Sequence, residues 1–206
     1  MRVLVACEYS GTVRDSFRAK GHDAWSCDLL PTETPGNHYQ CDVRELLTQP
    51  YDIVIAFPPC TYLCSSEMHW TVRGLRDPKL TEDALDFVRL LMGANTPHIA
   101  LENPVDKIST RIRKPDQIIH PHEFGHPESK TTCLWLKNLP LLKPTKIVAG
   151  REGRVWKEPP SEERWKNRSR TLTGIAEAMA DQWGVETAVK PIPPLSKDRG
   201  ILGVIL

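Results

Sequence analysis

Short apolar segments, each ending in a turn or in a polar or reactive residue, recur along the chain and constrain its fold more than any other feature. We expect strands at residues 2–7, 22–27, 38–41, 52–57 and 97–101. Helical segments separate several of these strands. Continuous apolar strands that alternate with helices favour an α/β fold with a doubly wound, mostly parallel sheet. Ligands bind such sheets at the carboxyl ends of the strands. In this chain, polar residues come directly after the expected strands, at those ends.

The rest of the chain completes this pattern within one domain. The other expected elements are helices over 13–19, 81–92 and 174–183 and strands over 131–136 and 146–149. Thr81 is the expected N-cap of the second helix, because its hydroxyl can accept a hydrogen bond from the first turn. A length of 206 residues suits one well-buried domain. We therefore expect a single domain over residues 1–188, followed by an extended, proline-containing tail over 189–206.

Composition and charge exclude several classes of protein. Hydrophobic residues make up 40% and charged residues 26%, and no apolar run approaches the roughly 18 residues of a membrane span. The net charge of +1 provides no general field for a polyanion, so a nucleic acid would need a local basic surface. Glu8 and Arg14 interrupt the apolar start before a secretory signal could be completed. We therefore expect a cytoplasmic protein without a membrane partner, whose six cysteines are reduced thiols.

Cys60 and Glu102 form the expected reactive centre. Cys60 follows Pro58 and Pro59 directly after a buried strand, and the two prolines fix the backbone that presents its thiol. Glu102 ends the next strand of the same sheet, so both side chains can face one cleft. A thiolate that adds to C6 of a pyrimidine makes C5 nucleophilic, and a carboxyl group bonded to N3 and the exocyclic amine drives that addition. These residue types therefore suit chemistry at C5 of a pyrimidine.

Both residues also have a structural interpretation, which the sequence leaves open. A single cysteine is more often a small, buried apolar residue than a nucleophile. Glu102 could instead place its carboxylate at a helix N-terminus, because Pro104 suits a first helical turn.

Two tripeptides carry a resemblance to a known family. Pro58-Pro59-Cys60 and Glu102-Asn103-Pro104, in this order and on successive strands, resemble the nucleophile and Glu-Asn motifs of the DNA cytosine-5 methyltransferases. The resemblance implies a Rossmann-like methyltransferase fold that uses S-adenosylmethionine, with Cys60 and Glu102 as catalytic residues. It further implies a small, phage-type member of the family, encoded by a phage or its bacterial host.

The Arg-rich motif of that family is similar to residues 124–132. Lys130 takes the place of the first arginine, and the resemblance implies that it is the third catalytic residue. Thr132 takes the place of the second arginine. The cationic contact to the carbonyl group of the base would then come from Lys130, Arg111 or Arg113.

The same resemblance implies where the cofactor binds. The family's Phe-x-Gly-x-Gly turn is similar to residues 9–13, in which the second glycine is lost. Asp28, after the second strand, fits the acidic residue that binds ribose hydroxyls, and Asp42, after the third, fits the acceptor of the adenine amine. Both aspartates could equally start turns, and Asp42 could cap a helix at Val43. The expected cofactor contacts are Tyr9, Ser10, Gly11, Asp28, Asp42 and Pro58.

The interval 137–170 is too short for the target-recognition domain of classical family members. It holds basic residues and tryptophans that could contact phosphates and stack bases, or that could simply form a solvated loop. These residues are Arg151, Arg154, Lys157, Arg164, Lys166, Arg168, Arg170, Trp156 and Trp165. The expected partner is DNA, as a single strand or with a flipped base, or a free pyrimidine nucleotide. The sequence leaves the oligomeric state open.

Two alternatives keep the fold and change the activity. A non-catalytic protein that binds S-adenosylmethionine or a nucleotide would tolerate the lost glycine and Thr132, and a related enzyme could deliver another one-carbon group to C5. Methylation of an amino group is disfavoured, because Phe57 and Cys60 flank the diproline where those enzymes need a polar residue and an aromatic one. Zinc at Cys60, Cys64 and His69 is disfavoured as well, because the spacing is unusual and no second pair follows.

Overall fold

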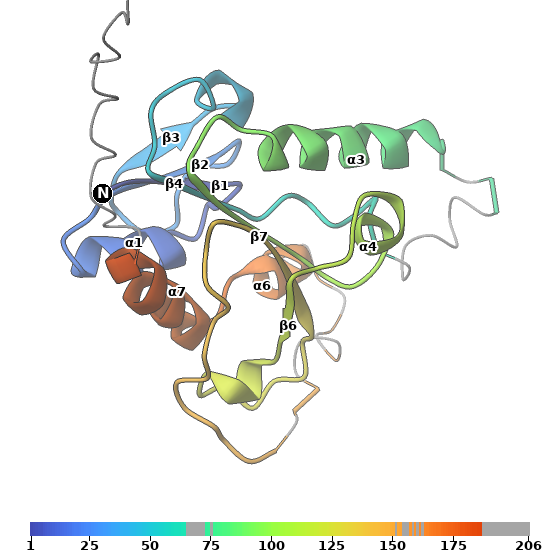
Figure 1. The fold of residues 1–206 in the computed structure, drawn as a ribbon. Coiled ribbons are helices and arrows are strands. Elements are labelled where there is room, and N and C mark those ends of the chain that lie inside the picture. The colour runs from blue at the N-terminus through green and yellow to red at the C-terminus, as the bar shows by residue number, and fades with distance from the viewer. Residues whose placement is uncertain are drawn as a thin grey trace, which may run out of the picture.

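A computed structural model of the chain describes residues 1–64, 73–74, 76–150, 152–153, 157, 159, 161 and 163–186. The predicted tail, 189–206, and the predicted domain boundary at 188 lie outside these residues. Within the described part, one sheet has seven strands in the order β3-β2-β1-β4-β5-β7-β6 (Figure 1). They are β1 (Arg2–Ala6), β2 (Asp23–Asp28), β3 (His38–Gln40), β4 (Ile53–Ala56), β5 (His98–Asn103), β6 (Gln117–Ile119) and β7 (Thr132–Lys137).

The sheet is parallel except at one edge. β1 lies between β2 and β4, β3 extends the sheet beyond β2, β5 extends it beyond β4, and all of these pairs are parallel. β7 runs antiparallel to both β5 and β6. The order differs from the dinucleotide-binding order 3-2-1-4-5-6 by the antiparallel strand between the last two positions. The prediction of a doubly wound, mostly parallel, Rossmann-like sheet is thereby confirmed.

Helices cover both faces of this sheet. They are α1 (Thr12–Ala19), η1 (Val43–Glu45), α3 (Lys79–Met92), α4 (Lys107–Arg111), η2 (Pro121–Glu123), α6 (Arg164–Ser169) and α7 (Thr173–Glu186). α1 and α7 pack side by side on one face, and α3 lies on the other (Figure 1).

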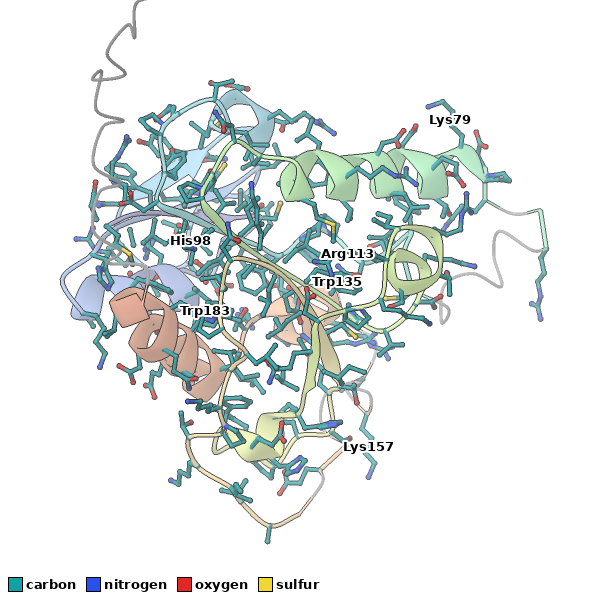
Figure 2. The ribbon with its side chains drawn as sticks, in the orientation of Figure 1. Lys79, His98, Arg113, Trp135, Lys157 and Trp183 are labelled. Atoms are coloured by element: carbon teal, nitrogen blue, oxygen red, sulfur yellow. The ribbon has the colours of Figure 1, made fainter. Side chains whose placement is uncertain are left out.

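Strand β1 shows why two cores form. Successive side chains of a strand point to opposite faces. Val3 and Val5 therefore enter the core under α1 and α7, which includes the buried Trp183 (Figure 2). Leu4 and Ala6 enter the core under α3. The whole strand except its first residue is buried, as expected for a central strand covered on both faces.

Two local predictions are wrong, and one strand was missed. Residues 146–149 form no strand, because this segment bonds to the turn around η2: the amide of Val148 donates to the carbonyl of His122 at 2.9 Å. Thr81 is not an N-cap, because α3 already begins at Lys79 and buries Thr81 in its first turn. The three-residue strand β6 was not predicted. Of the helices that the structure describes, none is both long and apolar enough to cross a membrane.

Candidate active site

Cys60 stands at the carboxyl end of the central strand β4. The four residues of β4 are buried, Pro58 is still buried, and Pro59 and Cys60 reach the surface. The carbonyl of Cys60 accepts hydrogen bonds from the amides of Leu63 at 2.9 Å and Cys64 at 3.0 Å. A helical turn therefore starts at Cys60, and this turn brings the side chains at positions 60 and 64 onto the same side.

The thiol of Cys64 makes a hydrogen bond with the sulfur of Cys60. This bond lowers the pKa of Cys60 from the 9.0 of a free thiol to about 7, and it raises the pKa of Cys64. Partial burial and the negative charge of Glu102 act in the opposite direction on Cys60, and the positive charge of Lys130 helps to lower its pKa. Because the thiolate is the nucleophilic form, a pKa near 7 makes Cys60 reactive at neutral pH.

Glu102 and Lys130 line one pocket, and Cys60 is not among its lining residues. Glu102 is the penultimate residue of β5, the strand next to β4, and α4 begins only at Lys107. Glu102 is therefore a strand residue and not the carboxylate of a helix N-terminus. The lining residues of the pocket are Phe57, Glu102, Pro121, Lys130, Thr132, Arg170, Thr171, Leu172, Ile175 and Met179.

The structure thus brings together the three side chains predicted to be catalytic. Both Glu102 and Lys130 lie close enough to Cys60 for their charges to change its pKa, in opposite directions. The ammonium group of Lys130 also donates to the carbonyl of Arg168 at 3.3 Å, which ties it to the end of α6.

Arg111 and Arg113 do not reach this pocket. Arg111 pairs with Glu82 of α3 at 2.8 Å, and Arg113 pairs with Asp116 at 2.8 Å. Arg113 also lies beside Trp135, whose indole nitrogen donates to its carbonyl at 2.9 Å (Figure 2). The arginine that does line the pocket is Arg170. The sequence placed Arg170 only among residues for phosphate contact.

Gly11 makes the turn after β1 possible. Its φ of +77° lies in the left-handed region, which favours glycine. A Cβ at this position would collide with the guanidinium of Arg14 and the hydroxyl of Thr34. Arg14 is fully buried and donates to the hydroxyls of Ser26 and Thr34. Gly11 is therefore needed to pack this turn against the loop after β2.

Glu8 occupies the N-terminus of α1. Its buried carboxylate accepts from the amides of Val13 at 2.6 Å and Arg14 at 3.2 Å. Burial raises the pKa of Glu8 from 4.5 to about 7, against the lowering effect of these two bonds. The sequence showed Glu8 only as an interruption of an apolar run, and no motif pointed to this contact. An anionic ligand cannot use the amides of Val13 and Arg14 while Glu8 holds them.

The side chains of Tyr9 and Ser10 contact different parts of the protein. The hydroxyl of Tyr9 donates to the carbonyl of Lys166 at 2.9 Å and lies 3.0 Å from the hydroxyl of Ser169. The Tyr9 ring also approaches the ring of Trp165. Helix α6 therefore covers the turn after β1. Ser10 is buried, and its hydroxyl lies 3.1 Å from that of Thr12.

Asp28 and Asp42 stand at the ends of β2 and β3, on the same side of β1. Together with burial, which is the largest cause, their charges raise the pKa of Cys7 to about 12. Asp28 accepts from the amide of Leu30 at 3.0 Å, and the amide of Leu29 is also directed at its carboxylate. Asp42 caps η1, because both of its oxygens accept from Arg44, from the amide at 2.9 Å and from the guanidinium at 2.8 Å.

The residues fit the nucleoside part of S-adenosylmethionine better than its amino acid part. Asp28 can accept a further bond from a sugar hydroxyl, since a carboxylate has more lone pairs than these amides use, and it lies at a strand end, the usual place for such a contact. Asp42 can accept a further bond, since a carboxylate has more lone pairs than Arg44 uses. At the other end, Glu8 already fills the N-terminus of α1. Pro58 is buried, and its carbonyl accepts from the side chain of Asn103.

No three His, Cys, Asp or Glu side chains within the described ranges gather closely enough to hold a metal ion. His69, which the weighed zinc site would need, lies outside those ranges.

Comparisons with known proteins give structural similarity alone. No protein-family model matches the chain, and no curated protein matches it in sequence. Solved structures are similar to it, among them three methyltransferases. A DNA modification methyltransferase encoded within a prophage of E. coli has a TM-score of 0.49 and 16% identity, over 78% of this chain and 55% of that one. The methyltransferase EhMeth of Entamoeba histolytica has a TM-score of 0.48 and 16% identity, over 72% of this chain and 57% of that one. The Dnmt2 methyltransferase of S. pombe has a TM-score of 0.45 and 14% identity, over 76% of this chain and 54% of that one. The chain therefore spans little more than half the length of the structures that it matches.

Proposed function

We propose that the protein is an S-adenosylmethionine-dependent methyltransferase that acts at C5 of cytosine through a covalent bond between Cys60 and C6 of the ring. The observation that carries the proposal is the placement of the Cys60 thiol. The thiol is exposed at the end of β4, and its pKa is lowered to about 7. The charges of Glu102 and Lys130 both act on it. An accessible thiol whose pKa is lowered by a hydrogen bond is typical of a nucleophile.

The three side chains have complementary roles in this chemistry. The Cys60 thiolate attacks C6 of the pyrimidine, and the electrons of the C5–C6 double bond become available at C5. Glu102 would donate its carboxyl proton to N3 and accept a hydrogen bond from the exocyclic amine, so that the negative charge that develops on the ring is neutralised as the thiolate adds. Lys130 stabilises the thiolate before attack by its positive charge. After methylation at C5, Glu102 would take back the proton from N3, and loss of the C5 proton to solvent would expel the Cys60 thiolate and restore the double bond.

The cofactor would be held at the carboxyl ends of β1 to β3. Asp28 would bind the ribose hydroxyls, Asp42 the adenine amine, and the turn of Tyr9, Ser10 and Gly11 would pack against the nucleoside. When bound there, S-adenosylmethionine supplies an electrophilic methyl group. Pro58 contributes through its buried position next to Cys60 and its bond to Asn103, which hold the loop between the two sites.

The substrate would be a cytosine in DNA or in a free nucleotide. Helix α6 offers a small surface for nucleic acid: Trp165 is 52% exposed, and the ammonium of Lys166 lies 5.7 Å from the centre of its ring. Exposed aromatic rings beside cations stack bases and contact phosphates. A base in duplex DNA would have to be flipped at a cost of a few kcal/mol, which single strands and nucleotides avoid.

Transfer of labelled methyl from S-adenosylmethionine tests this function. Duplex DNA, single-stranded DNA and deoxycytidine monophosphate are offered separately, and the digested product is identified by mass spectrometry. We expect 5-methylcytosine with at least one of them, and no product with Cys60→Ser, which should still bind the cofactor. Methyl on an exocyclic amine, or undiminished transfer by Cys60→Ser, would refute the proposal. Cofactor binding by the wild type without any transfer would favour the non-catalytic alternative.

A further inference from the structure

Cys60 and Cys64 lie on one helical turn that neighbouring elements fix in place. The carbonyl of Cys60 accepts from the amides of Leu63 at 2.9 Å and Cys64 at 3.0 Å, which closes the turn. Leu63 is buried in the core under α3. Its carbonyl accepts from the amide of Lys107, at the start of α4, at 3.2 Å. The turn is therefore anchored between its two cysteines.

The two sulfur atoms are adjacent, and one of them is accessible. Residues four apart in a helical turn have Cα atoms about 6 Å apart, which is within the roughly 4.4–6.8 Å that a disulfide bridges. The thiol of Cys64 donates a hydrogen bond to the sulfur of Cys60. Cys60 is exposed and Cys64 is partly buried, so a small solute reaches Cys60 first. The Cα separation of this turn therefore permits a disulfide between them.

A second pair of cysteines shows that proximity alone is not sufficient. Cys27 of β2 and Cys41, directly after β3, have sulfur atoms 3.9 Å apart. Cys27 is fully buried, and burial raises the pKa of its thiol. The hydrogen bond from Cys64 instead lowers the pKa of Cys60 to about 7, so about half of it is thiolate at pH 7. Because the thiolate is the form that reacts with an oxidant, Cys60 should react before Cys27.

We infer that Cys60 and Cys64 form a site of reversible oxidation, at which a hydroperoxide converts the two thiols to a disulfide. In the first step, the Cys60 thiolate attacks one oxygen of the peroxide. An S–O bond forms and the O–O bond breaks. The displaced oxygen takes up a proton and leaves as an alcohol or, from hydrogen peroxide, as water. Cys60 is then a sulfenic acid.

In the second step, Cys64 attacks the sulfenic sulfur of Cys60. An S–S bond forms and the S–O bond breaks, and the released hydroxide leaves as water with the proton of the Cys64 thiol. The two thiols together lose two electrons, and the peroxide is reduced by the same two electrons.

The first step prepares Cys64 for the second. In the reduced pair, the pKa of Cys64 is raised by its hydrogen bond to Cys60, by burial and by the negative charge of Cys60. A sulfenic acid carries no such charge, so the hydrogen bond to a thiolate and the repulsion by it are both lost. Cys64 can then lose its proton more easily and attack as a thiolate.

The oxidation itself does not depend on the proposed function, but its effect on methyl transfer does. A Cys60 sulfur held in a disulfide cannot add to C6 of a pyrimidine. A dithiol such as dithiothreitol reduces the disulfide by thiol–disulfide exchange and restores the thiolate. Methyl transfer should therefore stop on oxidation and return on reduction.

Peptide mapping after mild oxidation tests the inference. The reduced full-length protein is treated with a small excess of hydrogen peroxide and then denatured in N-ethylmaleimide, which labels every remaining thiol. Trypsin releases Cys60 and Cys64 together in peptide 45–73, and Cys27 and Cys41 together in peptide 21–44. The second peptide is therefore an internal control with the same number of thiols. Dimedone, added to a parallel sample, traps sulfenic acid.

Peptide 45–73 should lose both labelled thiols about tenfold faster or more than peptide 21–44, as a disulfide that dithiothreitol reverses. Cys64→Ala should form no disulfide there and should accumulate the dimedone adduct at Cys60. Cys41→Ala is the matched control and should oxidise at 45–73 like the wild type. The inference would be overturned if both thiols of 45–73 stayed labelled, if Cys60 of the wild type passed beyond sulfenic acid without a disulfide, or if both peptides oxidised equally fast.

Methyl transfer, measured before oxidation, after it and after dithiothreitol, separates the inference from the proposed function. If the disulfide forms but the reduced protein transfers no methyl group, the inference stands and the proposed function fails. If the reduced protein transfers methyl and peroxide produces no disulfide, the inference fails and the proposed function stands.

Discussion

The side-chain amide of Asn103 donates a buried hydrogen bond of 2.8 Å to the main-chain carbonyl of Pro58. This bond joins the end of β5 to the loop that follows β4. Because Glu102 precedes Asn103 and Cys60 follows Pro58 by two residues, the bond fixes the carboxylate and the thiol relative to one another. The bond therefore links the two tripeptides Pro58-Pro59-Cys60 and Glu102-Asn103-Pro104 in the structure.

Asn103→Ala should therefore reduce both stability and activity. The variant leaves the buried carbonyl of Pro58 without its donor, which costs about 1–3 kcal/mol of unfolding free energy. Urea denaturation and methyl transfer measure the two effects. Gln182→Ala is the matched control, because it removes an exposed amide bond of 2.8 Å to the carbonyl of Lys143, away from the site. An activity loss no larger than the control's would contradict the role of Asn103.

Cys64→Ala should raise the pKa of Cys60 above its value of about 7, because the hydrogen bond from Cys64 is the largest cause of the lowering. The rate of Cys60 alkylation by iodoacetamide then rises at higher pH than in the wild type. Cys64→Ser, which keeps a donor, should shift the midpoint less. Glu102 and Lys130 remain in place in both variants, so the shift reports on position 64. An unchanged midpoint in Cys64→Ala would rule out this activation.

Glu8→Gln should make stability less sensitive to pH. The folded pKa of Glu8 is raised, so its stabilising contribution is complete below pH 4.5 and is lost as pH rises through about 7. A shift from 4.5 to about 7 corresponds to about 3 kcal/mol. Between about pH 4.5 and about pH 8, the unfolding free energy of the variant, measured by urea denaturation, should rise relative to that of the wild type by an amount of this order. If the unfolding free energy of the variant did not rise relative to that of the wild type, the amides of α1 would offset the cost of burying the ionised Glu8 carboxylate.

Gly11→Ala and Gly21→Ala form a matched pair at the two ends of α1. Both glycines have positive φ, of 77° and 82°, so alanine at either position costs about 1 kcal/mol in backbone strain. Only at Gly11 would the added Cβ also collide with Arg14 and Thr34, whereas nothing lies within 4 Å of it at Gly21. Gly11→Ala should lower the melting temperature more than Gly21→Ala and weaken binding of S-adenosylmethionine. Equal effects of the two changes would argue against close packing at this turn.

The sequence predicted the sheet well because a buried strand leaves a local signal. The apolar runs of β1 and β4 are continuous, and the polar residues after them fall at one edge of a parallel sheet. The edge elements were harder, because β6 has only three residues and the segment at 146–149 bonds to a turn rather than to a strand. The start of α3 was misplaced for a similar reason, since Thr81 has the chemistry of a cap but is buried inside the first turn.

Residues of the candidate site could be predicted only where they belong to a short motif next to a predicted strand. Cys60 follows β4, Glu102 stands near the end of β5, and Lys130 precedes β7. Arg170 could not be assigned to the pocket, because its position depends on Glu33, which is 137 residues away in sequence. The role of Glu8 depends on how β1 turns into α1, which composition and spacing do not reveal.

The mass of the intact protein after incubation with S-adenosylmethionine and 5-fluorocytosine tests the central claim most directly. The fluorinated base is offered in duplex DNA, in single strands and as the deoxynucleotide, because fluorine at C5 blocks the final elimination. The account predicts a stable increase equal to the substrate plus one methyl group, mapped to Cys60 and absent in Cys60→Ala. A protein that binds S-adenosylmethionine but forms no such adduct with any of the three, or forms it at another residue, would contradict the account.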